Sequence, residues 1–185
     1  MDANFLKDNK VVSIPNFLKV SDRDRLSINR QIEHNYRKFN GKFHSYNFPV
    51  MEYNGTFFDD LYKKFYEESR KLLGPFTRSK ASSKMCWMYR SSAKDYNTGW
   101  HHHKNTSTIS GIYYYQTQRG DSVSFKNRFG KTHRHFVREG ELVIHPDHLL
   151  HTAEPPCSLI PNRYRYSIVI EIMTEETSEE LFSRI

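Results

Sequence analysis

Three histidines have the spacing of a metal site. His101 and His103 are separated by one residue, and His151 follows 48 residues after His103. Two residues at the shorter spacing lie on the same face of an extended segment. A third ligand from a distant strand completes a facial set that leaves other coordination positions open for chemistry. The pattern predicts that these three imidazoles bind one metal.

A carboxylate anchor is predicted further along the chain. Arg165 and Ser167 alternate with apolar residues in the strand-like run 163–173, so both fall on one face of that strand. A guanidinium and a hydroxyl on one face can hold a carboxylate, and polar groups that face the inside of a barrel line a pocket. A metal site combined with a carboxylate anchor indicates an enzyme.

Other histidines compete for the metal-binding role. The run 101–103 is also compatible with a solvated polar loop. We expect His102 to point away from the site, although a slip of one residue would exchange it with its neighbours. His145 and His148 are candidates for supporting the ligands, but we expect both to be exposed.

The anchor and the ligand set have further alternatives. Arg163 shares the predicted face of Arg165, although the Arg-x-Ser spacing favours Arg165. Asp95 and Asp121 are the nearby carboxylates that would replace an imidazole if one did not bind. Both stand beside turn residues, so we expect neither to be a ligand.

The elements that position these residues change character along the chain. Up to residue 83 the pattern is mixed, whereas after it short extended segments alternate with turns, which favours a sandwich or barrel. The predicted class is α+β, mainly β. We expect a strand over 10–18, helices over 21–36 and 57–73, a loop over 37–55, and strands near 84–91, 108–116, 122–126, 133–138, 141–145 and 163–173.

Length and composition limit the number of domains and the cellular compartment that we expect. The 185 residues suit one domain. No stretch approaches the roughly 20 apolar residues of a membrane span, and residues 1–10 are too polar for a secretory signal. Cys86 and Cys157 are too few for a disulfide framework. We therefore expect a cytoplasmic protein with no membrane partner.

Positive charge gathers in one stretch. The formal net charge is +7, and five cations fall within 126–138, whereas the tail over 174–180 is acidic. A basic surface attracts nucleic acid or an anionic substrate, and a solvated hairpin is the plainer alternative. We expect 126–138 to border the pocket and to serve substrate capture.

Four segments follow one another in a characteristic order and spacing. They are His101-x-His103, the strand Ser110-Gly111-Ile112-Tyr113-Tyr114, the stretch 139–146 that continues into Leu149-Leu150-His151, and Arg165-Tyr166-Ser167-Ile168. Together they resemble the jelly-roll core of the 2-oxoglutarate- and Fe(II)-dependent oxygenases, and most closely their prolyl-hydroxylase-like branch. The resemblance implies a double-stranded β-helix over 84–173, supported by the strand and helices of 1–83, in a single domain over 1–185.

The resemblance also implies a ligand set with one departure. His101 matches the first iron ligand of that family and His151 the third. His103 stands where the family usually has a carboxylate, so this chain is a His-x-His variant. Replacing a carboxylate with a neutral imidazole removes one negative charge from the site, which would weaken Fe(II) binding or shift reactivity.

The remaining site residues follow from the same resemblance. Arg165 matches the arginine that pairs with the distal carboxylate of 2-oxoglutarate, and Ser167 matches an accessory hydroxyl. Tyr114 and Tyr89 match tyrosines that donate to that carboxylate. The implied cofactors are Fe(II), 2-oxoglutarate as cosubstrate and O2. The implied activity is hydroxylation of a peptidyl residue, with proline among the candidates, or of a small molecule.

Two other classes of protein remain open. A cupin-like metalloenzyme could use the three histidines without 2-oxoglutarate, and it would not need Arg165 to face the metal. A non-enzymatic basic β-domain could bind nucleic acid through 125–138. Nucleic acid is not favoured as the enzyme's substrate, because the sequence offers no added base-stacking lid. We expect loops 37–55, 74–83 and 117–138 to select the substrate.

Overall fold

Two antiparallel β-sheets face each other, and helices cover the outer face of the larger one. The computed structural model describes residues 3–38, 56–80, 85–91, 99–154 and 164–185. The helices are α1 (Ala3–Asp8), α2 (Asp22–Lys38), α3 (Thr56–Leu73) and α4 (Ser178–Phe182). The strands are β1 (Val12–Ile14), β2 (Met85–Ser91), β3 (Ile109–Gln116), β4 (Ser122–Lys126), β5 (Thr132–Phe136), β6 (Leu142–Pro146), β7 (Leu150–Ala153) and β8 (Arg165–Ile172).

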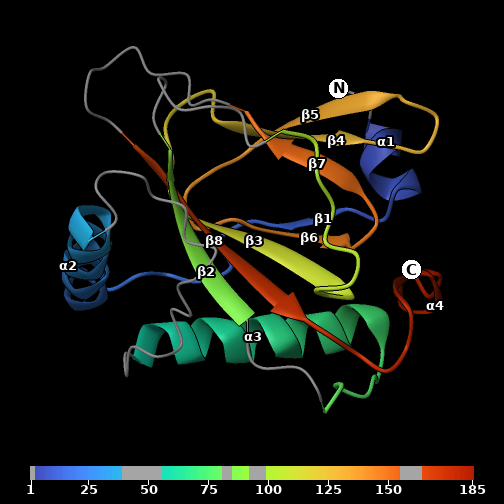
Figure 1. Ribbon diagram of the computed structural model, residues 1–185, viewed down its shortest axis with the longest axis horizontal. Coiled ribbons are helices and arrows are strands. Elements are labelled where there is room, and N and C mark those ends of the chain that lie inside the picture. The colour runs from blue at the N-terminus through green and yellow to red at the C-terminus, as the bar shows by residue number, and fades with distance from the viewer. Residues whose placement is uncertain (1–2, 39–55, 81–84, 92–98, 155–163) are drawn as a thin grey trace.

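Most neighbouring strands in the two sheets are not consecutive in the chain. The larger sheet has the order β1-β6-β3-β8-β2, and the smaller has the order β5-β4-β7. Figure 1 shows the smaller sheet above the larger one, with α3 lying across the opposite face. The expected fold class, mainly β with amino-terminal supporting helices, is confirmed.

Successive side chains of β8 point alternately to the hydrophobic core and to a pocket between the sheets. Ile168 and Ile170 point to the helices and join the main hydrophobic core. Arg165 and Ser167 point to the space between the two sheets, where they line a pocket. Glu171 lies on this second face and is also buried. The inward polar face predicted for this strand is present.

Helix α3 approaches the larger sheet closely at a glycine. A Cβ atom added to Gly111 on β3 would lie 2.5 Å from Cε2 of Phe65, which is fully buried on α3. A side chain at this position would displace the ring, because buried rings have little room to move. Gly111 therefore lets the helix pack directly on the strand that follows the first two histidines.

Several boundaries differ from those expected. The strand expected over 10–18 is only β1, because Lys10 and Asn16 adopt positive φ values of 57° and 52° that end the extended backbone on each side. The short elements α1, β7 and α4 were not expected. Most of the loop expected over 37–55 lies outside the described residues.

Two expectations about the setting can be compared with the structure. Within the described residues, no helix combines the length and the apolar character needed to cross a membrane. Cys86 is a free, buried thiol, and burial raises its pKa, so the thiol stays protonated. Cys157 lies outside the described residues.

Candidate metal centre

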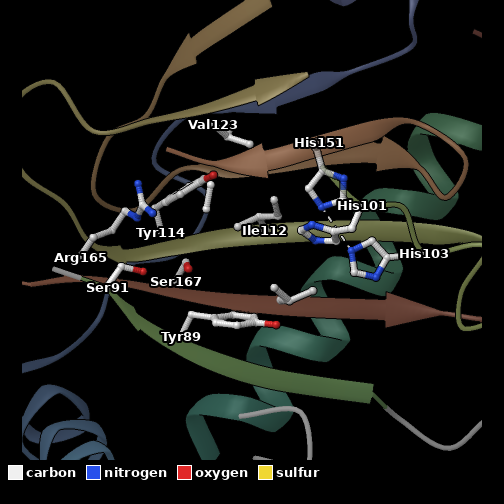
Figure 2. A pocket seen from close by; sticks show the side chains of 12 residues that line it. Tyr89, Ser91, His101, His103, Ile112, Tyr114, Val123, His151, Arg165 and Ser167 are labelled. Carbon is white, nitrogen blue, oxygen red and sulfur yellow. Dashed lines mark hydrogen bonds between the residues drawn. The ribbon is translucent and has the colours of Figure 1, made fainter. Parts of the chain in front are cut away.

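A pocket between the two sheets is lined by the predicted metal ligands and the predicted cosubstrate-binding residues. It comprises about 510 Å³ of space, including the part open to solvent. Figure 2 shows His101, His103 and His151 together at one end and Arg165 at the other. The lining residues are Tyr89, Ser91, His101, His103, Ile112, Tyr114, Val123, His151, Ala153, Arg165, Ser167 and Val169.

Backbone pairing brings the histidines together. His101 and His151 form an isolated antiparallel bridge, with the amide of each donating to the carbonyl of the other at 3.1 and 2.9 Å. The amide of His103 donates to the carbonyl of Asp147 at 2.8 Å. One potential ligand atom from each of the three imidazoles lies within 4.8 Å of the others.

The Nδ1 atom of each imidazole contacts an oxygen atom outside the cluster. His101 Nδ1 lies 2.9 Å from the carbonyl of Gly99, and His151 Nδ1 lies 3.1 Å from the carbonyl of Leu149. His103 Nδ1 is within ion-pair distance of the Glu171 carboxylate, but the contact does not have the geometry of a hydrogen bond. Because carbonyl oxygens can only accept, the contacts of His101 and His151 place a proton on Nδ1 of each ring and direct Nε2 inward.

The facing nitrogen atoms fit a divalent cation. Nε2 of His103 and Nε2 of His151 are 3.2 Å apart. Two lone pairs at this distance repel each other unless a proton or a cation lies near both. Two ligands bound at about 2.1 Å and at right angles on one metal are roughly 3.0 Å apart. Imidazole nitrogens are also ligands that iron accepts, so the residues present fit an Fe(II) site.

Burial keeps two of these imidazoles neutral. Desolvation lowers the pKa of His151 well below its ordinary value, and the neighbouring imidazoles of His145, His101 and His103 lower it further. Desolvation likewise lowers the pKa of His101. A neutral imidazole is the form that binds a metal, so both rings are ready to bind near pH 7.

The expectation that His145 is exposed is wrong. Its side chain is fully buried, and its ring centroid lies 4.5 Å from that of His151. Desolvation, followed by the neighbouring His103, lowers its pKa to about 3. The period-2 pattern of β6 places His145 on the inward face with Val143, which the sequence analysis overlooked. His148 is partly exposed and His102 is exposed, and neither lines the pocket.

A buried cation marks the other end of the pocket. Arg165 is 2% exposed, and Nη1 donates to the carbonyl of Ser122 at 3.2 Å. Within the described ranges, no carboxylate lies within ion-pair distance of its guanidinium. Since a buried charge is costly without a partner, this end of the pocket is suited to an anion.

Hydroxyl groups accompany this guanidinium. Ser167 and Tyr114 lie between Arg165 and the histidines in Figure 2. Burial raises the pKa of Tyr114, which keeps its hydroxyl protonated as a donor. Tyr89 lines the same pocket, and in Figure 2 its hydroxyl is directed toward the histidine end.

Of the alternative residues, Asp121 does not lie among the three histidines. Asp121 is buried, but its carboxylate accepts from the amide of Gln118 at 2.9 Å and is not part of the histidine cluster. Asp95 and Arg163 lie outside the described residues. Glu171, which contacts His103, was not selected from the sequence as a site residue. Its signal was present, because it is the one acidic residue on the inward face of β8.

Comparisons with known proteins give a likeness at the level of fold. No family model and no curated protein matches the sequence. Among solved structures, a prolyl-4-hydroxylase from Pseudomonas putida is 13% identical with a TM-score of 0.59, and the match covers 94% of this chain and 92% of that one. The non-heme alpha ketoglutarate dependent carbocyclase SnoK from nogalamycin biosynthesis is 12% identical with a TM-score of 0.63, covering 98% of this chain and 88% of SnoK.

A third solved structure is a prolyl hydroxylase from Trichoplax adhaerens in complex with a hypoxia inducible factor peptide fragment. It is 12% identical with a TM-score of 0.58, and the match covers 93% of this chain and 87% of that one. All three matches cover more than nine tenths of this chain. The chain therefore has the jelly-roll fold of the 2-oxoglutarate- and Fe(II)-dependent oxygenases, prolyl hydroxylases among them.

Proposed function

We propose that this chain is an Fe(II)- and 2-oxoglutarate-dependent dioxygenase. The observation that carries the proposal is the composition of one pocket. It has imidazole nitrogens at one end and, at the other, a buried guanidinium that has no carboxylate partner among the described residues. The first end is suited to a metal and the second to an anion. A cosubstrate that chelates iron and carries a distant carboxylate would use both.

Three residues would hold the iron. His101, His103 and His151 would bind it through Nε2, because their Nδ1 atoms already contact oxygen atoms outside the cluster. A facial set of three ligands leaves positions for the cosubstrate and O2. When bound, Fe(II) would supply the activation of O2 that couples oxidation of 2-oxoglutarate to succinate and CO2 with hydroxylation of the substrate.

Arg165 would orient the cosubstrate. Its guanidinium would pair with the distal carboxylate of 2-oxoglutarate in a bidentate contact, supported by the hydroxyls of Tyr114 and Ser167. That contact would direct the keto-acid end toward the histidines and so align it for reaction. Ile112 and Val123, between the two ends, would exclude water from the reacting groups.

The substrate would be a peptidyl residue or a small molecule. The comparison structures include a prolyl hydroxylase bound to a peptide and a carbocyclase of a biosynthetic route, so the same fold serves both classes. The β4–β5 hairpin carries most of the cluster of cations over 126–138, which would attract an anionic substrate. It lies beside the site, because β4 also pairs with β7, the strand that carries His151.

The two alternative classes have less support. A cupin-like enzyme that uses only the histidines leaves the buried charge of Arg165 without a role. A purely nucleic-acid-binding domain leaves both Arg165 and the inward-facing imidazoles without one. The dioxygenase accounts for all of these groups at once.

The test is O2-dependent consumption of 2-oxoglutarate. Protein loaded with Fe(II) should convert 2-oxoglutarate to succinate slowly even without its substrate, and His151→Ala protein should not. Metal-dependent O2 consumption that is indifferent to 2-oxoglutarate would instead favour the cupin-like enzyme. Absence of metal binding, together with salt-sensitive binding of nucleic acid, would favour the basic β-domain.

A further inference from the structure

Glu171 is a buried carboxylate at the histidine end of β8. It follows Arg165 by six residues on the same face of the strand, and its side chain is 0% exposed. In the described part of the chain, no lysine or arginine lies within ion-pair distance of Glu171, whose carboxylate contacts Nδ1 of His103 but accepts no hydrogen bond there. A buried carboxylate is strongly disfavoured unless it is paired, so this contact accounts for its position.

One imidazole links this carboxylate to the metal centre. His103 directs Nδ1 to Glu171 and holds Nε2 3.2 Å from Nε2 of His151. His101 and His151 direct their Nδ1 atoms to backbone carbonyls instead. Among contacts between described residues, His103 is the one predicted ligand that lies beside a negative charge. It also stands at the position where the resembling family has a carboxylate.

We propose that Glu171 supplies, through His103, the negative charge that a carboxylate ligand at position 103 would supply directly. A carboxylate that accepts from Nδ1 of a metal-bound histidine fixes the ring orientation and makes Nε2 a stronger donor to the metal. Glu171 is thus a positioning residue, and its assignment rests on the proposed function because it requires a metal at the histidines. The group of mutually close ligand atoms consists of the three imidazoles without Glu171, which separates this role from direct ligation.

The first test is the affinity for Fe(II), measured without O2 by competition with a chelating dye. Glu171→Gln should weaken Fe(II) binding about 10- to 100-fold, the loss typical of removing a carboxylate that supports a ligand. The matched control is Glu141→Gln. Glu141 is also buried and also contacts a histidine, since its Oε1 lies 2.6 Å from Nε2 of His135, but it is not part of the metal cluster. This variant should keep the wild-type affinity.

A double substitution separates electrostatic support from a merely structural role. In the His103→Asp background the metal would have a carboxylate ligand, and Glu171 would lie beside a second negative charge. Adding Glu171→Gln to this background should leave Fe(II) binding unchanged or stronger. The same loss in both backgrounds would overturn the proposal, and so would complete loss in Glu171→Gln alone, which would make Glu171 a direct ligand.

A measurement on the unaltered protein covers the case in which a variant does not fold. The probe is Zn(II)-loaded protein labelled with ¹⁵N-histidine and observed by NMR. The spectrum should show His103 protonated on Nδ1, with a proton that exchanges slowly with water, and metal-bound on Nε2. A proton on Nε2 of His103 overturns the inference. Unchanged Fe(II) affinity in Glu171→Gln overturns this inference alone, whereas failure of the wild type to bind Fe(II) overturns the proposed function.

Discussion

His103 and His151 are 48 residues apart in the chain, yet their Nε2 atoms lie 3.2 Å apart. The bridge between His101 and His151 brings the two segments into contact, and the Nδ1 contacts turn all three rings so that Nε2 faces inward. Two imidazole nitrogens at this distance share either a proton, as in a hydrogen bond, or a bound cation. This relationship is the strongest structural support for a metal centre.

Removal of His151 should abolish metal retention. His151→Ala removes the one ligand contributed by β7, and we expect Fe(II) affinity to fall by more than about 100-fold, beyond the loss for a supporting residue. Metal content after gel filtration checks this. The matched control is His102→Ala, because His102 is exposed and adjacent to two predicted ligands but does not line the pocket. Equal metal loss in the two variants would contradict the assignment.

Replacement of Arg165 should separate cosubstrate binding from metal binding. Arg165→Ala should raise the 2-oxoglutarate concentration needed for half-maximal turnover by roughly 30-fold or more, because a buried charged contact contributes about 2 to 5 kcal/mol. Metal content should stay intact. Arg165→Lys should fail as well, since a point charge cannot supply the bidentate contact. An unchanged 2-oxoglutarate requirement in Arg165→Ala would remove this residue from the site.

The metal-free protein should lose stability in acid through His145. Its pKa is about 3 in the folded state, so between pH 6.5 and 3 the unfolded chain binds a proton that the folded chain does not. Stability therefore falls as the pH drops through this window, by about 1.4 kcal/mol for each pH unit. His145→Phe should reduce the pH dependence of the free energy of unfolding in urea by about one proton's worth, while His151 and His101, whose pKa values are also lowered, keep part of it. A slope that does not change would show that other groups cause the acid sensitivity.

The basic hairpin should affect substrate capture and leave the reaction at the metal intact. Nζ of Lys126 lies 4.4 Å from the ring centroid of Trp100, which adjoins His101, so the hairpin borders the histidine end. Neutralising Lys126, Arg128 and Lys131 together should weaken binding of an anionic substrate and flatten its salt dependence. Uncoupled succinate formation should persist.

The control for the hairpin is an equal change of charge elsewhere. It neutralises three exposed lysines that do not line the pocket, Lys19, Lys63 and Lys64. If this variant reproduces the loss, net charge alone is responsible. If the hairpin variant loses uncoupled succinate formation, the hairpin supports the core, and if it changes nothing, its charges form only a solvated face.

Strong periodicity made part of the fold predictable from sequence. The alternation over 165–172 predicted which residues face the helices and which face the pocket, and β8 has that pattern. The apolar spacing over 57–73 similarly predicted α3. Short elements lack such a signal: β7 has only four residues, although it carries His151. Helix α4 was missed even though Thr177 and Glu180 form a capping box that can be read from the sequence.

Site residues could be predicted from sequence where the side-chain type itself suggests a ligand. Residues whose role depends on being buried were harder to predict. The three histidines and Arg165 have functional groups and spacings that suggest chemistry, and the structure brings them to one pocket. His145, which stands next to Pro146, was expected to be exposed. Its actual environment depends on the opposite sheet, where Phe125 packs against its ring. The alternation of β8 could have placed Glu171 on the inward face, but its contact with His103 joins distant segments and so has no local pattern.

The most direct test of the dioxygenase assignment is an anaerobic titration of the protein with Fe(II) and then 2-oxoglutarate, followed by visible absorption. Chelation of the iron by the keto-acid should produce a charge-transfer band that requires both components. The band should be absent in His151→Ala, and in Arg165→Ala it should need much more 2-oxoglutarate. A wild-type protein that binds Fe(II) but develops no band at saturating 2-oxoglutarate would contradict the account.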